Sequence, residues 1–414
     1  MSNKGKMNVP ELRFPEFEGE WEEKKLEDTL EFIKDGTHGT HENVNKGPWL
    51  LSAKNIKNNK IIISSDDRKI SESDYKKIYK NYKLEKGDLL LTIVGTIGRA
   101  AIVKNPNNIA FQRSVAILKT KATYDVEFIF QLFQTNYFKN LLLRKQVVSA
   151  QPGLYLGDIR KIKISITNII EEQRKIGIFF RKIDRQIELE EQKLELLQQQ
   201  KKGYMQKIFS QELRFKDEDG EDYPDWEEKK LGDITEQSMY GIGASAIEFD
   251  SKNIYIRITD IDEKSRKLNY QNLTTPDELN NKYKLKRNDI LFARTGASTG
   301  KSYIHKEEKD IYNYYFAGFL IKFEINEQNS PLFIYQFTLT SKFNNWVKVM
   351  SVRSGQPGIN SEEYAKLPLV LPNKLEQQKI AKFLDRFDQQ IELEKQKIET
   401  LQQQKKSLLQ SMFI

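Results

Sequence analysis

Two long segments of the chain, residues 176–208 and 380–412, place mostly apolar side chains at steps that alternate strictly between four and three residues. Both segments are rich in Glu, Gln, Lys and Leu, which lose little side-chain freedom in a helix. A period of about 3.5 residues is typical of the seam of a left-handed coiled coil, not of a helix lying on a broad core. The expected seam residues are Ile183, Ile187, Leu194, Leu197, Phe387, Ile391, Ile398 and Leu401.

Two charges interrupt each seam, Glu190 and Lys201 in the first and Glu394 and Lys405 in the second. A parallel homodimer would stack like charges at these positions. Antiparallel pairing within one chain would instead place Glu190 near Lys405 and Lys201 near Glu394. We therefore predict an antiparallel coiled coil of two helices, each roughly 45–55 Å long at about 1.5 Å per residue. Oligomerisation, the commoner role of a heptad repeat, stays open as an alternative.

The whole chain is a tandem repeat, with the second half offset by about 205 residues. Trp-Glu-Glu-Lys-Lys-Leu occurs at residues 21–26 and again at 226–231, and Gln-Pro-Gly occurs at 151–153 and 356–358. The order of the shared motifs is the same in both halves. We conclude that the sequence arose by duplication, with a globular half followed by a long helix in each copy.

The middles of the two halves, residues 33–82 and 237–283, agree least. Two different specificities on one scaffold would produce this pattern, and so would drift in unconstrained loops. We place the first globular domain at residues 1–170, its helix at 171–211, the second globular domain at 212–374 and its helix at 375–414.

Within the globular halves, residues 89–94 and 290–293 are apolar and end at glycine turns, as buried strands do. Residues 126–145 and 331–348 have the pattern of amphipathic helices. Each half is therefore predicted to be α+β, and the complete chain a duplicated α+β domain with two long helices.

The chain has a modest excess of basic residues. Lys and Arg outnumber Asp and Glu by 67 to 59, which gives a net charge of +8. A basic excess suits a polyanionic partner, because neutralised phosphates release counterions, although it also serves simple solubility. The chain has no Cys, which excludes disulfides, thiolate zinc sites and thiol nucleophiles. The first residues are polar and Arg99 interrupts the longest apolar stretch, so we expect a cytoplasmic protein without a membrane span.

No known catalytic motif fits the sequence. Residues 296–302 resemble a phosphate-binding P-loop, but three residues separate the glycines where the motif needs four. Residues 241–246 imitate a dinucleotide fingerprint, yet residues 235–240 before them lack the apolar pattern of a strand, which favours a loop. The three His are too few for a convincing metal site, and without any Pro-Pro pair the adenine-methyltransferase motif is absent. We predict no catalytic residue and no metal site.

Laid out in this way, the chain resembles the specificity subunit of type I restriction-modification systems, the HsdS family. The resemblance is carried by the duplicated framework: the Trp-Glu-Glu motifs, Gly-Asp-Leu-Leu-Leu from Gly87 and Asn-Asp-Ile-Leu-Phe from Asn288, and the Gln-Pro-Gly loops. It is also carried by Glu-Gln-x-Lys-Ile at the start of each helix, from Glu172 and from Glu376. It covers essentially the entire chain.

The resemblance implies a non-catalytic subunit with two target recognition domains, each reading half of a bipartite, asymmetric site in double-stranded DNA. It implies that the helices set the gap between the half-sites and dock two modification subunits. Those partners would bind S-adenosylmethionine and methylate adenine, and restriction subunits would use ATP and magnesium for translocation and cleavage.

Base-contacting residues cannot be carried over from the family, so candidates follow from side-chain chemistry near the divergent loops and glycine turns. Arg, Lys, Asn, Gln, Ser and Thr suit base edges and phosphates. The candidates in the first half are Thr37, His38, His41, Lys54, Asn55, Arg99, Arg113 and Gln151. Those in the second half are Tyr240, Arg257, Arg266, Arg294, Ser298, Lys301, Arg353 and Gln356.

Two competing interpretations remain. A fused nucleic-acid enzyme would need catalytic motifs that the sequence lacks. A coiled-coil scaffold that binds protein would explain the helices but not the two aromatic-rich domains.

Overall fold

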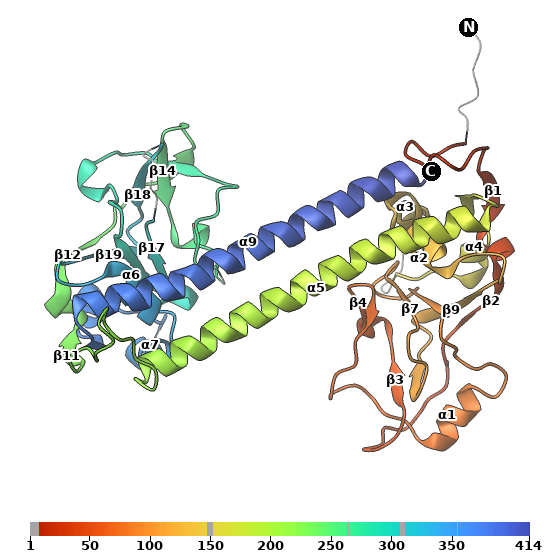
Figure 1. The fold of residues 1–414 in the computed structure, drawn as a ribbon, viewed down its shortest axis with the longest axis horizontal. Helices are drawn as coiled ribbons and strands as arrows, with labels where there is room; N and C mark the ends of the chain where they lie inside the picture. The colour runs from red at the N-terminus through yellow and green to blue at the C-terminus, as the bar shows by residue number, and fades with distance from the viewer. Residues whose placement is uncertain (1–7, 147–151, 264, 307–310, 354) are drawn as a thin grey trace, which may run out of the picture. The chain divides into compact units, whose positions relative to one another are not determined.

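The computed structural model describes residues 8–146, 152–263, 265–306, 311–353 and 355–414. The chain divides into two compact units (Figure 1). Unit 1 comprises Met1–Gln192 and Lys395–Ile414, and unit 2 comprises Lys193–Glu394. The long helices α5 (Ile170–Phe209) and α9 (Lys374–Met412) each contribute a segment to both units.

Unit 1 is built on a four-stranded antiparallel sheet in the order β2-β9-β6-β7. These strands are Leu30–Asp35, Val115–Thr120, Leu89–Thr92 and Ala100–Ile102. Three two-stranded pairs accompany the sheet: β1 (Glu22–Lys25) with β10 (Lys163–Ile166), β3 (Trp49–Leu51) parallel to β8 (Ile109–Phe111), and the hairpin β4 (Ile56–Lys57) with β5 (Lys60–Ile61). The shorter helices are α1 (Glu72–Ile78), α2 (Val126–Gln134), α3 (Asn136–Lys145) and α4 (Leu156–Arg160).

Unit 2 repeats this plan, with a sheet in the order β12-β19-β16-β17. These strands are Thr235–Tyr240, Leu320–Ile325, Ile290–Ala293 and Ser302–Ile304. The pairs are β11 (Glu227–Lys230) with β20 (Pro368–Leu371), β13 (Ala246–Glu248) with β15 (Thr274–Pro276), and β14 (Asn253–Ile256) parallel to β18 (Asn313–Phe316). Its shorter helices are α6 (Pro331–Phe337), α7 (Ser341–Met350) and α8 (Ser361–Ala365).

The predicted duplication, the α+β class and the two buried strands are confirmed, since β6 and β16 are fully buried at the centre of equivalent sheets. One segment whose pattern did not indicate a strand is nevertheless a strand. Thr235–Tyr240 forms β12 at the edge of its sheet, although its side chains are mostly exposed. An edge strand is held by backbone bonds on one side and does not need an apolar pattern. None of the described helices is both long and apolar enough to cross a membrane.

The two predicted amphipathic helices are each broken in two, so that part of the prediction is wrong. Thr135 ends α2 and caps α3, because its hydroxyl accepts from the Phe138 backbone N–H at 3.1 Å. In the same way, the Thr340 hydroxyl accepts from the Phe343 backbone N–H at 3.2 Å and caps α7. A threonine that serves as an N-cap adopts an extended backbone, which interrupts the helix before it.

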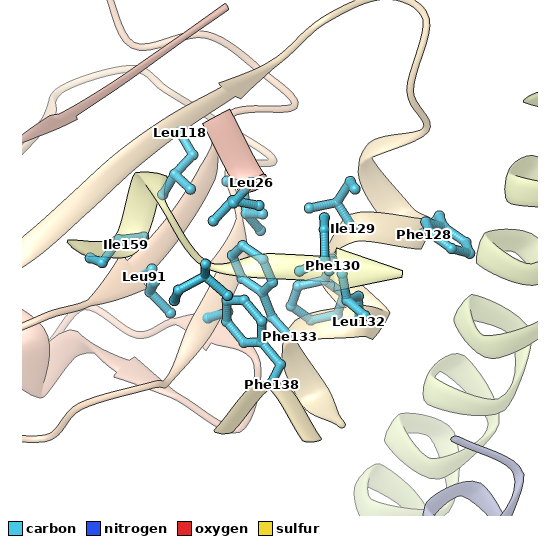
Figure 2. Close-up of a cluster of buried hydrophobic side chains, with 14 of the residues drawn as sticks. Leu26, Leu91, Leu118, Phe128, Ile129, Phe130, Leu132, Phe133, Phe138 and Ile159 are labelled. Carbon is cyan, nitrogen blue, oxygen red and sulfur yellow. The ribbon is translucent and has the colours of Figure 1, made fainter. Parts of the chain in front are cut away.

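The break at Thr135 lets the two short helices fold back onto the sheet. Phe133 and Phe138, one from each helix, stack at 4.2 Å between ring centroids with their planes 4° apart. Figure 2 shows both rings near Leu91 of the central strand. All three side chains are completely buried. The core of unit 1 therefore lies between its sheet and α2–α3.

Within each unit, the segments of α5 and α9 pair antiparallel. In unit 1, Lys405 Nζ lies 2.6 Å from Asp184 and Lys397 Nζ lies 2.5 Å from Glu190. In unit 2, Lys201 Nζ lies 2.7 Å from Asp388, and Lys193 pairs with Glu394. The partner number on α9 falls as the number on α5 rises, so the antiparallel prediction is confirmed.

The predicted partners of the two lysines were wrong. Lys405 binds Asp184 rather than Glu190, and Lys201 binds Asp388 rather than Glu394, a shift of six residues in each case. The aspartates lie next to the seam and not on it, where a periodicity argument did not look for charge. They also accept from Gln131 of α2 at 2.9 Å and Gln336 of α6 at 2.8 Å. Each lysine is thus fixed where the helix pair meets its globular half.

The burial of the helix faces agrees with the seam. Ile187 and Ile398 are buried, and the other expected seam residues are half-buried. By contrast, Leu189, Leu196 and Leu393 lie off the seam and are 47%, 54% and 64% exposed. Leucine occurs on both faces, so the period and not the residue type determines which leucines are covered.

We predict that Ile187→Asp lowers the free energy of unfolding by about 3 kcal/mol, because an unpaired carboxylate would be placed in the apolar seam. Leu189→Asp is the matched control, two residues away on the exposed face, and is expected to change stability by less than about 0.5 kcal/mol. Urea unfolding followed by circular dichroism measures both. Equal effects of the two changes would show that the seam is misassigned.

Candidate nucleic-acid interface

Each unit carries a glycine turn directly after its central strand. In unit 2 the turn follows β16 and contains Gly296 and Gly300, with φ values of +73° and +87°. In unit 1 it follows β6 and contains Gly95 and Gly98, at +77° and +85°. These left-handed conformations favour glycine. The turn in unit 2 leads into strand β17, not into the helix that a P-loop requires, so its interpretation as a tight turn is confirmed.

A buried tyrosine supports the turn of unit 2 from below. The Tyr364 hydroxyl donates to the Ala293 carbonyl at 2.7 Å and accepts from the Gly300 backbone N–H at 3.1 Å. Burial raises the pKa of the Tyr364 phenol, so the hydroxyl keeps its proton and donates at neutral pH. A Cβ at Gly300 would lie 2.5 Å from Val347 Cγ1, which leaves no room for a larger residue. The turn is therefore rigid.

The Gln-Pro-Gly loop docks on the glycine turn in both units through equivalent backbone bonds. In unit 2, the Gly296 N–H donates to the Pro357 carbonyl at 2.9 Å. In unit 1, the Gly95 N–H donates to the Pro152 carbonyl at 3.1 Å. Gln356 is exposed in this loop. Its counterpart Gln151 lies outside the described residues.

Around this junction, unit 2 gathers a set of exposed side chains. The Arg294 guanidinium lies 4.8 Å from the centroid of the Tyr240 ring. The Arg294 backbone N–H donates to the Phe319 carbonyl at 3.1 Å, and the Phe319 side chain is 63% exposed. Arg353 contacts both carboxylate oxygens of Glu363, at 2.5 and 2.6 Å. We call Tyr240, Arg294, Phe319, Arg353 and Gln356 the unit 2 surface.

The equivalent region of unit 1 carries different side chains. The Arg113 N–H donates to the Thr37 carbonyl at 3.1 Å, and Thr37 Oγ1 lies 2.9 Å from His41 Nε2. His38 is exposed and pairs with Asp35. Tyr155, just after the Gln-Pro-Gly loop, is 67% exposed. We call Thr37, His38, His41, Arg113 and Tyr155 the unit 1 surface.

An open cavity of about 240 Å³ lies beside Thr37 in unit 1. Lys34 and Lys77 line it together with Tyr79 and Tyr82, and the Lys34 ammonium lies 4.6 Å from the centroid of the Tyr82 ring. Burial and the nearby Asp88 carboxylate raise the pKa of Tyr82, whose hydroxyl donates to Asp88 at 3.0 Å. Cationic and aromatic groups together suit a phosphate or a base edge.

The remaining sequence candidates do not join these surfaces. Asn55 is buried and donates to Asp67 at 2.7 Å, and Lys301 is buried with its ammonium 3.3 Å from the Ile261 carbonyl. Burial does not suit direct contact with DNA, so neither is kept as a candidate. Lys54 pairs with Asp67, Arg257 pairs with Asp260, and Ser298 is half-buried in the glycine turn. The Arg99 guanidinium donates to the Ile56 carbonyl, and the Arg266 backbone N–H donates to the Asp262 carbonyl.

Sequence reasoning missed Phe319 and Tyr155. Both are aromatic, and an exposed aromatic residue cannot be distinguished from a core residue by its type alone. Phe319 follows Gly318 in the tight turn between β18 and β19, and that glycine was the only available signal. Across the described ranges, no cluster of three or more His, Asp or Glu side chains is arranged to hold a metal ion.

Comparison with known sequences gives the same family in both halves. The sequence model of the type I restriction modification DNA specificity domain matches residues 18–199 and again 223–403. A putative type I restriction enzyme MjaX specificity subunit from Methanocaldococcus jannaschii is 25% identical over 240 residues, which cover 54% of this chain and 55% of that protein. The type I restriction enzyme HindI specificity subunit from Haemophilus influenzae is 27% identical over 198 residues, covering 46% and 41%. The chain spans about half the length of these relatives.

Two solved structures share the fold. The S subunit of a type I restriction-modification system from M. genitalium superposes with a TM-score of 0.64 at 15% identity, covering 98% of this chain and 99% of that chain. A chain from a structure on complex assembly and conformational transition of the type I R-M system gives a TM-score of 0.54 at 13% identity, covering 95% and 97%. At these identities the likeness concerns the fold alone.

Proposed function

Because the chain belongs to the family of type I restriction modification DNA specificity domains, we propose that it is the DNA-specificity subunit of a type I restriction-modification complex. It binds a bipartite, asymmetric site in double-stranded DNA, with one half-site for each unit. The recognition domains are residues 1–170 and 212–374, and a long helix follows each of them, at 171–211 and 375–414.

The observation that carries this proposal is one framework bearing two different surfaces. The bond from Gly95 to Pro152 reappears as the bond from Gly296 to Pro357. The unit 1 surface contains a threonine, two histidines and Arg113, whereas the unit 2 surface contains Tyr240, Arg294 and an exposed phenylalanine. A duplicated scaffold with unlike surfaces suits two unlike half-sites.

The chemistry of both surfaces suits DNA. Arginine pairs with guanine through two hydrogen bonds, threonine and glutamine bind base edges, and an apolar side chain can contact the thymine methyl group. The net charge of +8 favours the phosphate backbone.

We propose that catalysis belongs to partner subunits and that the complex works in the cytoplasm. Two modification subunits would bind S-adenosylmethionine and methylate adenine, and restriction subunits would use ATP and magnesium. The chain would position these partners on the site it has bound.

Selection from random duplexes by the complex of this chain with its modification subunits tests the proposal. We expect two short fixed blocks of unlike sequence, separated by a constant number of unselected base pairs. A single continuous block would contradict the assignment of one half-site to each unit. Binding without any sequence preference would contradict recognition itself.

Arg294→Ala is expected to weaken binding by about 1–3 kcal/mol and to relax the preference at one position of one half-site. The reason is that Arg294 is exposed and held over Tyr240 beside the glycine turn. Lys342→Ala, an exposed residue of α7, is the control and should change affinity by less than about 0.5 kcal/mol. Fluorescence anisotropy with single-substitution duplexes measures both. A loss shared evenly by all sequences would assign Arg294 to phosphate contact instead.

A further inference from the structure

The divergent middles of the two halves contain the same hairpin, which the sequence does not reveal. In unit 1, β3 leads through a 3-10 turn at Ala53–Asn55 into a hairpin that pairs Ile56 with Ile61. In unit 2, β14 leads through a 3-10 turn at Ile258–Asp260 to a hairpin closed by Ile261 and Leu268. We call these two segments the brace hairpins.

Each brace hairpin is entered through the same cap. Asn55 accepts from the Ser52 backbone N–H at 3.0 Å, and Asp260 accepts from the Arg257 backbone N–H at 2.9 Å. In each case the side chain of the last residue in the 3-10 turn accepts from the backbone N–H of the residue just before the turn. The sequence candidates Asn55 and Arg257 therefore shape the entry to the hairpin.

On one side, each brace hairpin is tied to the glycine turn of its unit. The Arg99 guanidinium donates to the Ile56 carbonyl at 3.3 Å, and the Lys301 ammonium donates to the Ile261 carbonyl at 3.3 Å. Both cations directly follow the second glycine of their turn, and both carbonyls belong to the first isoleucine of their hairpin. The contact has thus been kept in both copies although arginine has been exchanged for lysine.

On the other side, each brace hairpin is tied to a long helix by an ion pair. Lys60 Nζ lies 2.8 Å from Glu188 of α5, and Lys267 Nζ lies 2.9 Å from Glu392 of α9. The two lysines occupy the residue before Ile61 and the residue before Leu268, so they are equivalent in the hairpins. Hydrogen bonds from Lys60 and Arg185 lower the pKa of Glu188 to about 2, which keeps this carboxylate charged at neutral pH.

Stability alone gives little reason for these ion pairs. The lysines are 41% and 54% exposed, and pairs so open to solvent add little to folding. The same pair nevertheless occurs in both copies, and its lysine lies within the segments whose sequences differ most. What the two pairs share is their place in a chain of contacts that runs from helix to hairpin, to glycine turn and to the Gln-Pro-Gly loop.

We propose that Lys60 and Lys267 are positioning residues for DNA recognition, each holding the surface of its own unit in a fixed orientation against the helix through the brace hairpin. This inference rests on the proposed function. Neither lysine touches a base. Each acts through the contact between its brace hairpin and the glycine turn of its own unit.

The test uses the complex of this chain with its modification subunits and duplexes that carry one substitution in either half-site. The quantity measured is the ratio of affinities for matched and mismatched DNA. We expect Lys267→Glu to lower this ratio roughly fivefold at one half-site only, and Lys60→Glu to lower it at the other half-site only. Lys182→Glu and Lys382→Glu, exposed lysines of α5 and α9, are the controls and should change neither ratio.

A charge exchange separates positioning from general damage. Lys267→Glu with Glu392→Lys restores an ion pair of opposite polarity and should recover most of the lost ratio. The exchange is made in unit 2, because Lys at position 188 would face Arg185 in unit 1. The proposal is overturned if neither single variant changes the affinity ratio, or if a single variant changes it equally at both half-sites. It is also overturned if the charge exchange restores no more of the ratio than the single variant retains. If the unaltered complex does not discriminate at either half-site, the proposed function fails, and the brace with it.

Discussion

Arg13→Met lowers the free energy of unfolding of unit 1 by about 3–5 kcal/mol, because it leaves a buried carboxylate without its partner. Glu172, in the first turn of α5, is completely buried and accepts from Arg13 Nε at 2.7 Å and from Nη2 at 2.8 Å. The hydrogen bond to Glu172 raises the pKa of the Arg13 guanidinium, which keeps this guanidinium charged in the folded state.

The equivalent pair in unit 2 supplies a matched comparison. Arg214 Nη2 lies 2.8 Å from Glu376, which also accepts from Trp226 Nε1 at 3.2 Å. Because the indole would remain as a donor, Arg214→Met is expected to cost less than Arg13→Met. Arg13→Lys should recover only part of the lost stability. It restores the positive charge, but an ammonium cannot make the two parallel bonds of a guanidinium. Urea unfolding measures all three variants, and a loss below about 1 kcal/mol for Arg13→Met would show that water reaches Glu172.

Phe413→Ala is expected to lower the free energy of unfolding by about 3–5 kcal/mol and to impair recognition at the half-site of unit 1 first. The Phe413 ring is nearly buried and lies 5.1 Å from Phe128, 6.1 Å from Trp21 and 6.1 Å from Phe180, measured between centroids. The last turn of α9 thus completes the core of the first globular half, and the Leu12 N–H donates to the Ser411 carbonyl at 2.8 Å.

The matched variant is Phe209→Ala at the equivalent position of α5. Phe209 packs on Phe333 at 5.3 Å and on Phe337 at 5.7 Å in unit 2. We expect Phe209→Ala to impair the other half-site. Binding to duplexes with one altered half-site, together with thermal unfolding, distinguishes the two variants. If both impaired the same half-site, the assignment of one half-site to each unit would be wrong.

The features that the sequence predicted are those in which a local pattern determines the structure. The heptad period predicted two helices close to the observed Ile170–Phe209 and Lys374–Met412. Repeated motifs predicted the duplicated framework, and the charge pattern predicted antiparallel pairing. In each case residues near in sequence, or identical between copies, carried the information.

The features that it missed depend on tertiary contacts. Nothing local indicates that Lys405 reaches Asp184, because that aspartate is placed by Gln131 of another helix. The brace hairpins follow equivalent strands and 3-10 turns but share almost no sequence, so comparing the copies hid them. Phe319 could not be recognised as exposed before the turn that carries it was known. Some candidates chosen by residue type therefore lie on the unit 1 and unit 2 surfaces, and others make internal contacts at the brace hairpins and glycine turns.

Under the proposed function, this chain determines where DNA is methylated. Methylome sequencing of cells that express the chain with its modification subunit, compared with cells that express the modification subunit alone, tests it most directly. We predict methylated adenines at a split, asymmetric motif that is present only when the chain is present. The absence of any such motif, with an active modification subunit in the same cells, would contradict the account.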